Sequence, residues 1–262
     1  MSSAESPVPD ITPPPLPPPA AKPPRVWKFW GTLAWSLLLY GVMTISASLG
    51  IVLATLWFDI DITNPSALRN DGIVVAATST SAIIPVLLVI ALAVRLARQN
   101  FGAYLALRLP SARHAVIGLG ATVLLMILID TTTALTGRPI VPDVMIVQVS
   151  SASFHGALGL FALALVVTAP ITEEIVFRGF VYRGFSASRL GTIGAIAVSS
   201  LIFTAIHIQY DLFTLCGVML LALLLGTIRA LSGSTVLTIA MHALNNSVVL
   251  IETLWFAGML GN

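Results

Sequence analysis

Two adjacent carboxylates and an arginine interrupt a stretch of this chain that is otherwise typical of a membrane span. Glu173 and Glu174 precede Arg178, and residues 156–167 upstream carry no charge. A charged side chain near the middle of a bilayer costs roughly 2.5–3.5 kcal/mol. The charges therefore predict a functional site that faces the interior of a helix bundle or a wet cavity.

The spacing of these charges predicts a division of labour between the two acids. In a helix, Glu174 and Arg178 are four residues apart on one face, with the acid N-terminal, which is the favourable order for pairing. Glu173 points about 100° away from Glu174. We therefore predict that Arg178 neutralises Glu174, while Glu173 stays free for chemistry.

Three further polar side chains fall within apolar segments. His207 follows Phe203 by four residues, and Asn246 follows His242 by four, so each pair shares one face of a helix. A carboxylate in a low-dielectric pocket is a stronger general base, and a histidine beside it can share the water that it activates or ligate a metal. A histidine with an amide donor can stabilise an oxyanion. The sequence has neither a recognisable serine nucleophile nor an HExxH pattern, so amide hydrolysis by water with Glu173 as base is the simplest reaction.

Composition places these residues in a polytopic membrane protein. Of the 262 residues, 57% are hydrophobic and 9% charged, against roughly 25% charged in soluble domains. The net charge of +2 gives no argument for nucleic acid as a partner, and a single cysteine excludes a disulfide framework within the chain. We expect an all-α bundle of about seven transmembrane helices, with eight as the alternative, embedded in the lipid bilayer of the cell membrane.

Three regions follow from the apolar pattern. Residues 1–26 are Pro-rich and are predicted to be a disordered tail, 27–150 to hold the N-terminal transmembrane helices, and 151–262 the catalytic helices. The predicted spans are 30–57, 72–94, 115–129, 156–180, 193–207, 212–228 and 236–256. Residues 100–109 are predicted to form a short interfacial amphipathic turn, and residues 130–155 an external loop.

The basic residues predict the orientation. Of the 13 lysines and arginines, all but Arg69 and Arg138 belong to connections that fall on the same side as the N-terminus. Because positive charge is enriched on the cytoplasmic side, the N-terminus is predicted to be cytoplasmic and the C-terminus external. One feature conflicts with this topology. Counted from the cytoplasmic ends of the predicted helices, His242 lies at a shallow depth in the membrane, Glu173 at an intermediate depth and His207 near the far end. The fifth helix must begin below the membrane surface, or be tilted or interrupted.

The three polar patterns together resemble a known family signature. Glu173-Glu174 with Arg178, then Phe203 with His207, then His242 with Asn246, is similar to the EExxxR, FxxxH and HxxxN motifs of the CAAX protease and bacteriocin-processing (CPBP) intramembrane proteases, which include the type II CAAX prenyl endopeptidases. The resemblance implies that Glu173 and His207 activate water, that His242 and Asn246 form the oxyanion site, and that Glu174 and Arg178 support them. The family is often called metalloprotease, and the sequence leaves open whether a divalent metal such as zinc takes part.

The leading hypothesis is thus an intramembrane endopeptidase that acts on a membrane-associated peptide or protein, with a prenylated CAAX-type substrate as one option. Two other classes remain. One is a non-catalytic membrane scaffold or bacteriocin-immunity-type protein. The other is a transporter that uses the polar residues as a proton relay, although the chain lacks the internal repeats common among transporters.

Overall fold

The fold is an all-helical membrane bundle. The computed structural model describes residues 23–58, 60, 63–64, 68 and 70–260, and every regular element among these is a helix. Helices long and apolar enough to cross a membrane are α1 (Phe29–Trp57), α3 (Gly72–Leu96), α5 (Ala112–Leu135), the continuous helix Leu158–Ser186, α11 (Leu212–Ser232) and α12 (Thr235–Phe256). A shorter apolar helix, α10 (Gly191–Ala205), makes the seventh. The predicted class and the approximate number of spans are confirmed.

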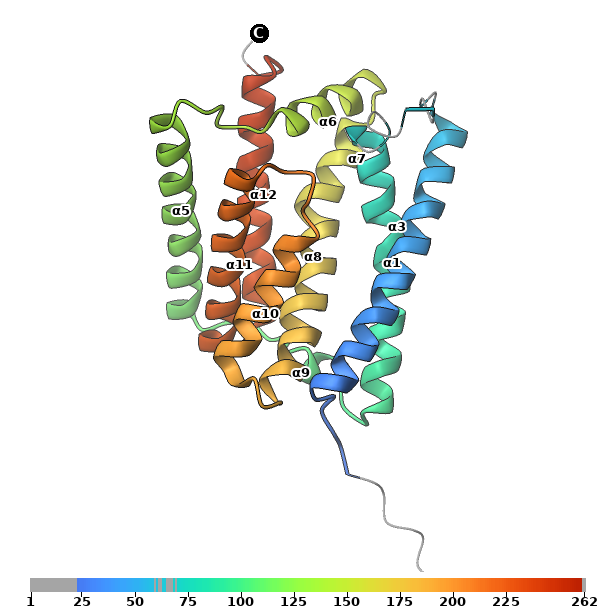
Figure 1. Ribbon diagram of the computed structural model, residues 1–262, viewed down its shortest axis with the longest axis vertical. Coiled ribbons are helices and arrows are strands. Elements are labelled where there is room, and N and C mark those ends of the chain that lie inside the picture. Colours follow the sequence, from blue (N-terminus) through green and yellow to red (C-terminus); the bar gives the residue numbers. More distant parts are fainter. Residues whose placement is uncertain (1–22, 59, 61–62, 65–67, 69, 261–262) are drawn as a thin grey trace, which may run out of the picture.

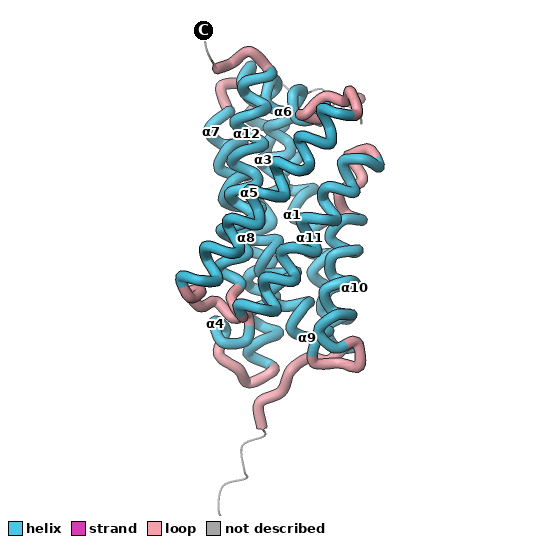
Figure 2. The backbone as a smooth tube through the Cα atoms, turned by 90° about the vertical axis from the view of Figure 1, so that its left-hand side faces the viewer, coloured by secondary structure: helices cyan, strands magenta, loops and turns pink. Residues whose placement is uncertain are grey.

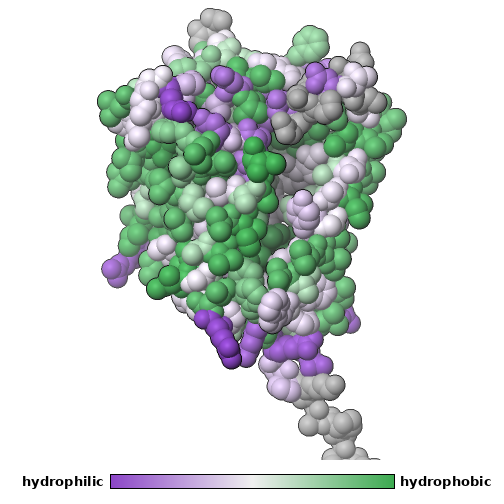
Figure 3. All heavy atoms as spheres, viewed as in Figure 1, coloured by the Kyte–Doolittle hydropathy of each residue, from purple (hydrophilic) through white to green (hydrophobic). Residues whose placement is uncertain are grey.

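The helices run between two ends of the molecule. The described chain begins at the lower end in Figure 1 and finishes at the upper end. The short helix α4 (Phe101–Tyr104) and the end of helix Leu158–Ser186 lie at the lower end, and α6 (Asp143–Phe154) lies at the upper end (Figure 2). Hydrophobic side chains cover most of the face between these ends, and hydrophilic ones gather toward the ends (Figure 3). This distribution is that of a multi-pass membrane protein.

One connection differs from its predicted form. The predicted loop 130–155 contains α6, and α5 continues past its predicted end at position 129 to Leu135. The sequence around α6 is only weakly periodic, so its helical form was not recognised. Residues 100–109, by contrast, contain only the single turn α4, as predicted.

Part of the predicted N-terminal tail is fixed to the bundle. Residues 1–22 lie outside the described residues, but the backbone N–H of Arg25 donates to the Ala97 carbonyl at 3.0 Å. The indole Nε1 of Trp27 donates to the Ala93 carbonyl at 2.9 Å. The prediction of a free tail up to position 26 is therefore wrong for these last residues, because the main chain and the indole find acceptors at the end of α3.

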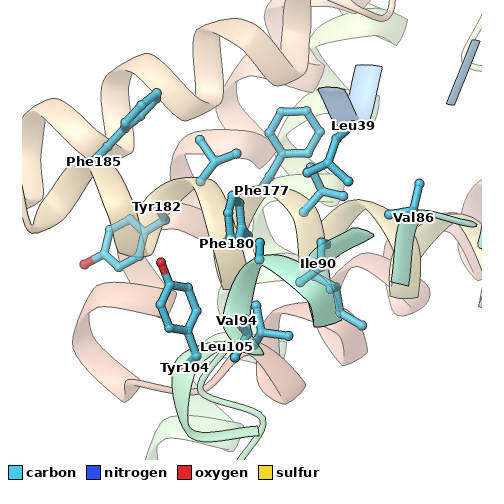
Figure 4. Packing of buried hydrophobic residues seen from close by; sticks show 14 of the residues in the cluster. Leu39, Val86, Ile90, Val94, Tyr104, Leu105, Phe177, Phe180, Tyr182 and Phe185 are labelled. Atoms are coloured by element: carbon cyan, nitrogen blue, oxygen red, sulfur yellow. The ribbon is translucent and has the colours of Figure 1, made fainter. Parts of the chain in front are cut away.

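The largest core cluster lies toward the same end. It joins side chains of α1, α3, the α4 turn and the second half of helix Leu158–Ser186; ten of them are labelled in Figure 4: Leu39, Val86, Ile90, Val94, Tyr104, Leu105, Phe177, Phe180, Tyr182 and Phe185. Phe180 and Tyr104 have ring centroids 5.8 Å apart. This packing holds the helix that carries Glu173 and Glu174 against α3.

The shortness of α10 resolves the conflict in depth. Its 15 residues rise about 22 Å, less than the roughly 30 Å of the hydrocarbon core. In Figure 1, α10 begins at the lower end and stops partway up, and the linker 206–211 rises to the start of α11. The linker that carries His207 therefore begins partway up the bundle rather than at the far end. The prediction that the fifth helix extends to His207 is wrong, because the helix ends at Ala205.

Candidate active site

The helix Leu158–Ser186 is locally irregular around the two acids. It consists of α7 (Leu158–Leu163), a π-helical segment η1 (Ala164–Thr168), α8 (Ala169–Glu174), a second π-helical segment η2 (Ile175–Val181) and α9 (Tyr182–Ser186). π-Helical turns are rare and are often found at functional sites. Pro170 contributes to this irregularity, since its ring removes one backbone donor. The two π segments were not predicted from the sequence, in which Pro170 was the available signal.

Glu174 and Arg178 form the predicted pair, completely buried. Arg178 Nη1 lies 2.7 Å from Glu174 Oε1, and the two side chains are 1% and 0% exposed. His242 Nδ1 approaches the same oxygen at 3.1 Å. The spacing in the sequence pairs His242 with Asn246 and does not predict this contact with Glu174, because a contact between two helices leaves no spacing signal in one sequence.

Arg178 is held from two further directions. Its Nη2 donates to the Ala222 carbonyl at 3.0 Å, and its guanidinium carbon lies 4.6 Å from the centroid of the Phe203 ring. A guanidinium over an aromatic face is attracted by the ring quadrupole. The buried ion pair therefore connects helix Leu158–Ser186 to α10 through Phe203, to α11 through Ala222 and to α12 through His242.

Glu173 faces a cavity instead of an ion-pair partner. It is partly exposed, and its Oε2 is buried without a hydrogen-bond partner in the described structure. The cavity measures about 1000 Å³ and is also lined by Phe203, His207, His242 and Asn246. All four predicted catalytic residues thus line one cavity, and the supporting pair lies behind it.

The linker after α10 presents His207 to this cavity. His207 Nδ1 lies 2.7 Å from the Phe203 carbonyl oxygen. A carbonyl only accepts, so Nδ1 carries the proton, and in the neutral ring Nε2 is left as an acceptor. The ring also stacks on Tyr210 at 6.3 Å, with an angle of 11° between planes. The backbone thereby fixes both the tautomer and the orientation of the imidazole.

Asn246 already uses part of its hydrogen-bonding capacity. Its Nδ2 donates to the Leu165 carbonyl in η1 at 2.9 Å, and its Oδ1 accepts from Asn245 Nδ2 at 3.1 Å. The Leu165 carbonyl is available because a π-helical segment shifts the backbone pairing locally. An amide nitrogen carries two hydrogens, so one N–H of Asn246 is left for another acceptor.

The donor set does not form a three-ligand metal site. Among the described residues, no three His, Cys, Asp or Glu side chains gather closely enough to hold an ion. His242 Nδ1 and His207 Nδ1 both contact protein oxygens, so Nε2 is the ring nitrogen of each that could reach an ion. We therefore derive no step of the reaction through a metal.

The comparison with protein families agrees with the motifs. Residues 155–248 match the family model described as "Type II CAAX prenyl endopeptidase Rce1-like". We refer to residues 155–248 as the Rce1-like segment. It contains every predicted site residue and supports the CPBP resemblance.

A relative and the solved structures add little about activity. An 86-residue stretch is 35% identical to the Escherichia coli protein described as "Uncharacterized 24.3 kDa protein"; it covers 32% of this chain and 39% of that one. The match thus spans well under half the length of either protein. No solved structure matches the chain.

Proposed function

We propose that this protein is an intramembrane endopeptidase in which Glu173 activates water to hydrolyse a peptide bond. One observation carries the proposal: Glu173, which has no ion-pair partner among the described residues, lines one cavity together with His207, His242 and Asn246. Its Oε2 is buried without a hydrogen-bond partner in the described structure, which is costly unless the carboxylate serves a function. The Rce1-like segment, whose family name is that of prenyl endopeptidases, supports the same class of reaction.

In the proposed reaction, a water molecule lies between Glu173 and His207. The Glu173 carboxylate accepts a proton from this water as the water oxygen attacks the carbonyl carbon of the substrate. His207 Nε2 can accept the second hydrogen bond of the water, since Nδ1 is committed to Phe203. The proton held by Glu173 then passes to the amine nitrogen as the carbon–nitrogen bond breaks.

The attack places negative charge on the former carbonyl oxygen. We propose His242 and Asn246, which line the same cavity, as its hydrogen-bond donors. When both ring nitrogens of His242 carry a proton, Nδ1–H donates to Glu174 Oε1 and Nε2–H is the donor to the oxyanion. Arg178 stabilises the Glu174 carboxylate, which in turn holds the His242 ring in position beside the cavity.

The substrate class follows from the surroundings. The cavity lies within the apolar bundle, so the substrate is a membrane-associated peptide or protein, with a prenylated C-terminal peptide as the first candidate. We further propose that the protein resides in the cell membrane with its N-terminal end in the cytoplasm, because the basic residues gather at that end.

The test uses the purified full chain in detergent. Cleavage is measured on a farnesylated C-terminal peptide, on its unprenylated counterpart and on a library of membrane-anchored peptides. Each assay is run with and without a chelator. Glu173→Gln should abolish cleavage, because glutamine keeps the shape of the side chain but cannot accept a proton at neutral pH. The matched control is Asp71→Asn, a carboxylate-to-amide change at the N-cap of α3, where asparagine caps equally well; this variant should remain active.

Each outcome has a clear consequence. Unchanged cleavage by Glu173→Gln would refute the role of Glu173 as base. If the unsubstituted chain cleaves none of the membrane-anchored peptides, the endopeptidase proposal is refuted and a non-catalytic scaffold is favoured. Loss of activity with chelator would show that a metal is required in addition to the residues named.

A further inference from the structure

A second cavity lies at the opposite end of the bundle from α6 and is lined by three arginines. It measures about 690 Å³, and Arg108, Arg183 and Arg229 contribute to its wall together with Asn100 and Tyr182. None of these residues belongs to the candidate active site. Three guanidinium groups around one cavity create a strong local positive potential.

No described acid neutralises these three arginines. The ion pairs within the described part of the chain involve only Arg138, Arg178 and His242 as the cationic partners. Arg183 Nε is moreover buried without any hydrogen-bond partner. A buried donor left unsatisfied is destabilising, and more so when it belongs to a charged group, so an anion in the cavity would be favourable.

The backbone positions two of the three side chains. Arg108 Nε donates to the Gly233 carbonyl at 2.8 Å, and Arg108 Nη2 occupies the space that a Cβ at position 233 would need. Gly233, at φ +63°, also ends α11 in a conformation that suits glycine. Arg229 Nε donates to the Arg178 carbonyl and to Thr235 Oγ1, both at 3.0 Å. The guanidinium groups are therefore held in place before a ligand arrives.

The depth of the cavity identifies the source of the anion. Arg183 and Arg229 lie in the last turns of their helices, and Arg108 lies between α4 and α5. The ends of spanning helices coincide with the headgroup layer of a bilayer, and basic pockets between such helices bind lipid headgroups. Arginine matches phosphate through paired hydrogen bonds.

We propose that Arg108, Arg183 and Arg229 form a binding site for the headgroup phosphate of an anionic lipid. The exposed side chain of Arg108 would bind the phosphate from the water side. Arg183 and the buried Arg229 would hold it from the bundle side.

The experiment measures thermal unfolding of the full chain in neutral detergent as three probes are added separately: short-chain phosphatidylglycerol, phosphatidylcholine with the same acyl chains, and inorganic phosphate. Phosphatidylglycerol should raise the midpoint, because a ligand that binds only the folded state stabilises it. Arg183→Gln and Arg108→Gln should each weaken the apparent affinity by about tenfold, the loss of roughly one charge-assisted hydrogen bond. Arg189→Gln is the matched control, since Arg189 is exposed near the same end but does not line the cavity.

Three results would overturn the proposal. Equal stabilisation by phosphatidylcholine would show that the acyl chains, not the anionic headgroup, bind. Equal affinities of Arg183→Gln and Arg189→Gln would show that general surface charge is responsible. Saturation by inorganic phosphate with no effect of the lipid would assign the site to a soluble phosphate compound. Because Arg108 is exposed, its variant keeps the test decisive if Arg183→Gln fails to fold.

Discussion

At the scale of single residues, the site separates one buried, neutralised acid from one acid that faces a cavity. Glu174 accepts from both Arg178 and His242 on Oε1, whereas Glu173 takes part in no ion pair among the described residues and lines the cavity. The motif spacing was sufficient to predict this separation, since it depends only on which helix face each acid occupies. It was not sufficient to predict the contact of His242 with Glu174, which depends on how α12 packs against another helix.

The buried pair gives a prediction about stability. Arg178→Ala should lower the free energy of unfolding by about 3–5 kcal/mol, because it leaves the Glu174 charge uncompensated in the bundle. Glu173→Gln should cost much less, since Glu173 has no ion-pair partner within the described structure. Thermal unfolding of both purified variants checks this. Equal melting temperatures would mean that Glu174 is not held by Arg178 in the way the contacts indicate.

Shared action on one water gives a prediction about additivity. If Glu173 and His207 act on the same molecule, the double variant Glu173→Gln/His207→Ala should be scarcely slower than either single variant, because groups that act as a unit are non-additive. Residual cleavage rates of the three variants, measured on the same peptide, provide the test. Losses that multiply would place the two residues in separate steps.

At the scale of elements, the sequence predicted which segments are helices better than where they end or bend. Apolar length reports the tendency to enter a bilayer, but not the depth that a helix reaches, so the early end of α10 was not predicted. The rotation of 100° per residue holds for a regular α-helix, so it could not predict the π-helical segments η1 and η2. Yet η1 supplies the Leu165 carbonyl to Asn246, and the end of α10 sets the position of His207.

Close contact between the start of α1 and α9 gives a prediction at this scale. A Cβ at Gly184 would meet Thr32 Oγ1 at 1.7 Å and the Trp27 carbonyl oxygen at 2.5 Å. Gly184→Ala should therefore separate α1 from α9 and destabilise the protein by about 1–3 kcal/mol, the usual cost of overpacking. Thermal unfolding of the variant gives the measurement.

The matched control for this change is Gly41→Ala in α1, where a Cβ would meet nothing within 4 Å. There alanine should be neutral or stabilising by up to about 1 kcal/mol, since glycine is the poorer helix former. If both variants melt at the same temperature, the contact between Gly184 and the start of α1 does not contribute to packing.

At the scale of the whole molecule, the two ends of the bundle have different chemical character. The arginine-lined cavity lies at the end where the described chain begins, together with α4 and α9. The cavity of the candidate active site reaches instead toward the end that carries α6, where Arg138 and Asp211 form an exposed ion pair at 2.6 Å. A backbone bond from Thr214, aided by Arg138, holds the pKa of Asp211 below its usual value. In the proposed orientation, the end that carries α6 faces the outside of the cell.

Orientation gives the last prediction. In a Cys216→Ser background, which removes the single native cysteine, a cysteine at Ala112 should react with a membrane-impermeant thiol reagent only from the cytoplasmic side. A cysteine at Phe154, at the end of α6 and 87% exposed, should react only from outside. The physical reason is that translocating the arginine-rich connections is unfavourable, which keeps them on the cytoplasmic side. Labelling of both positions from one side would contradict a membrane crossing by α5, which lies between them. Reversed labelling would place the arginine-lined cavity in the outer leaflet.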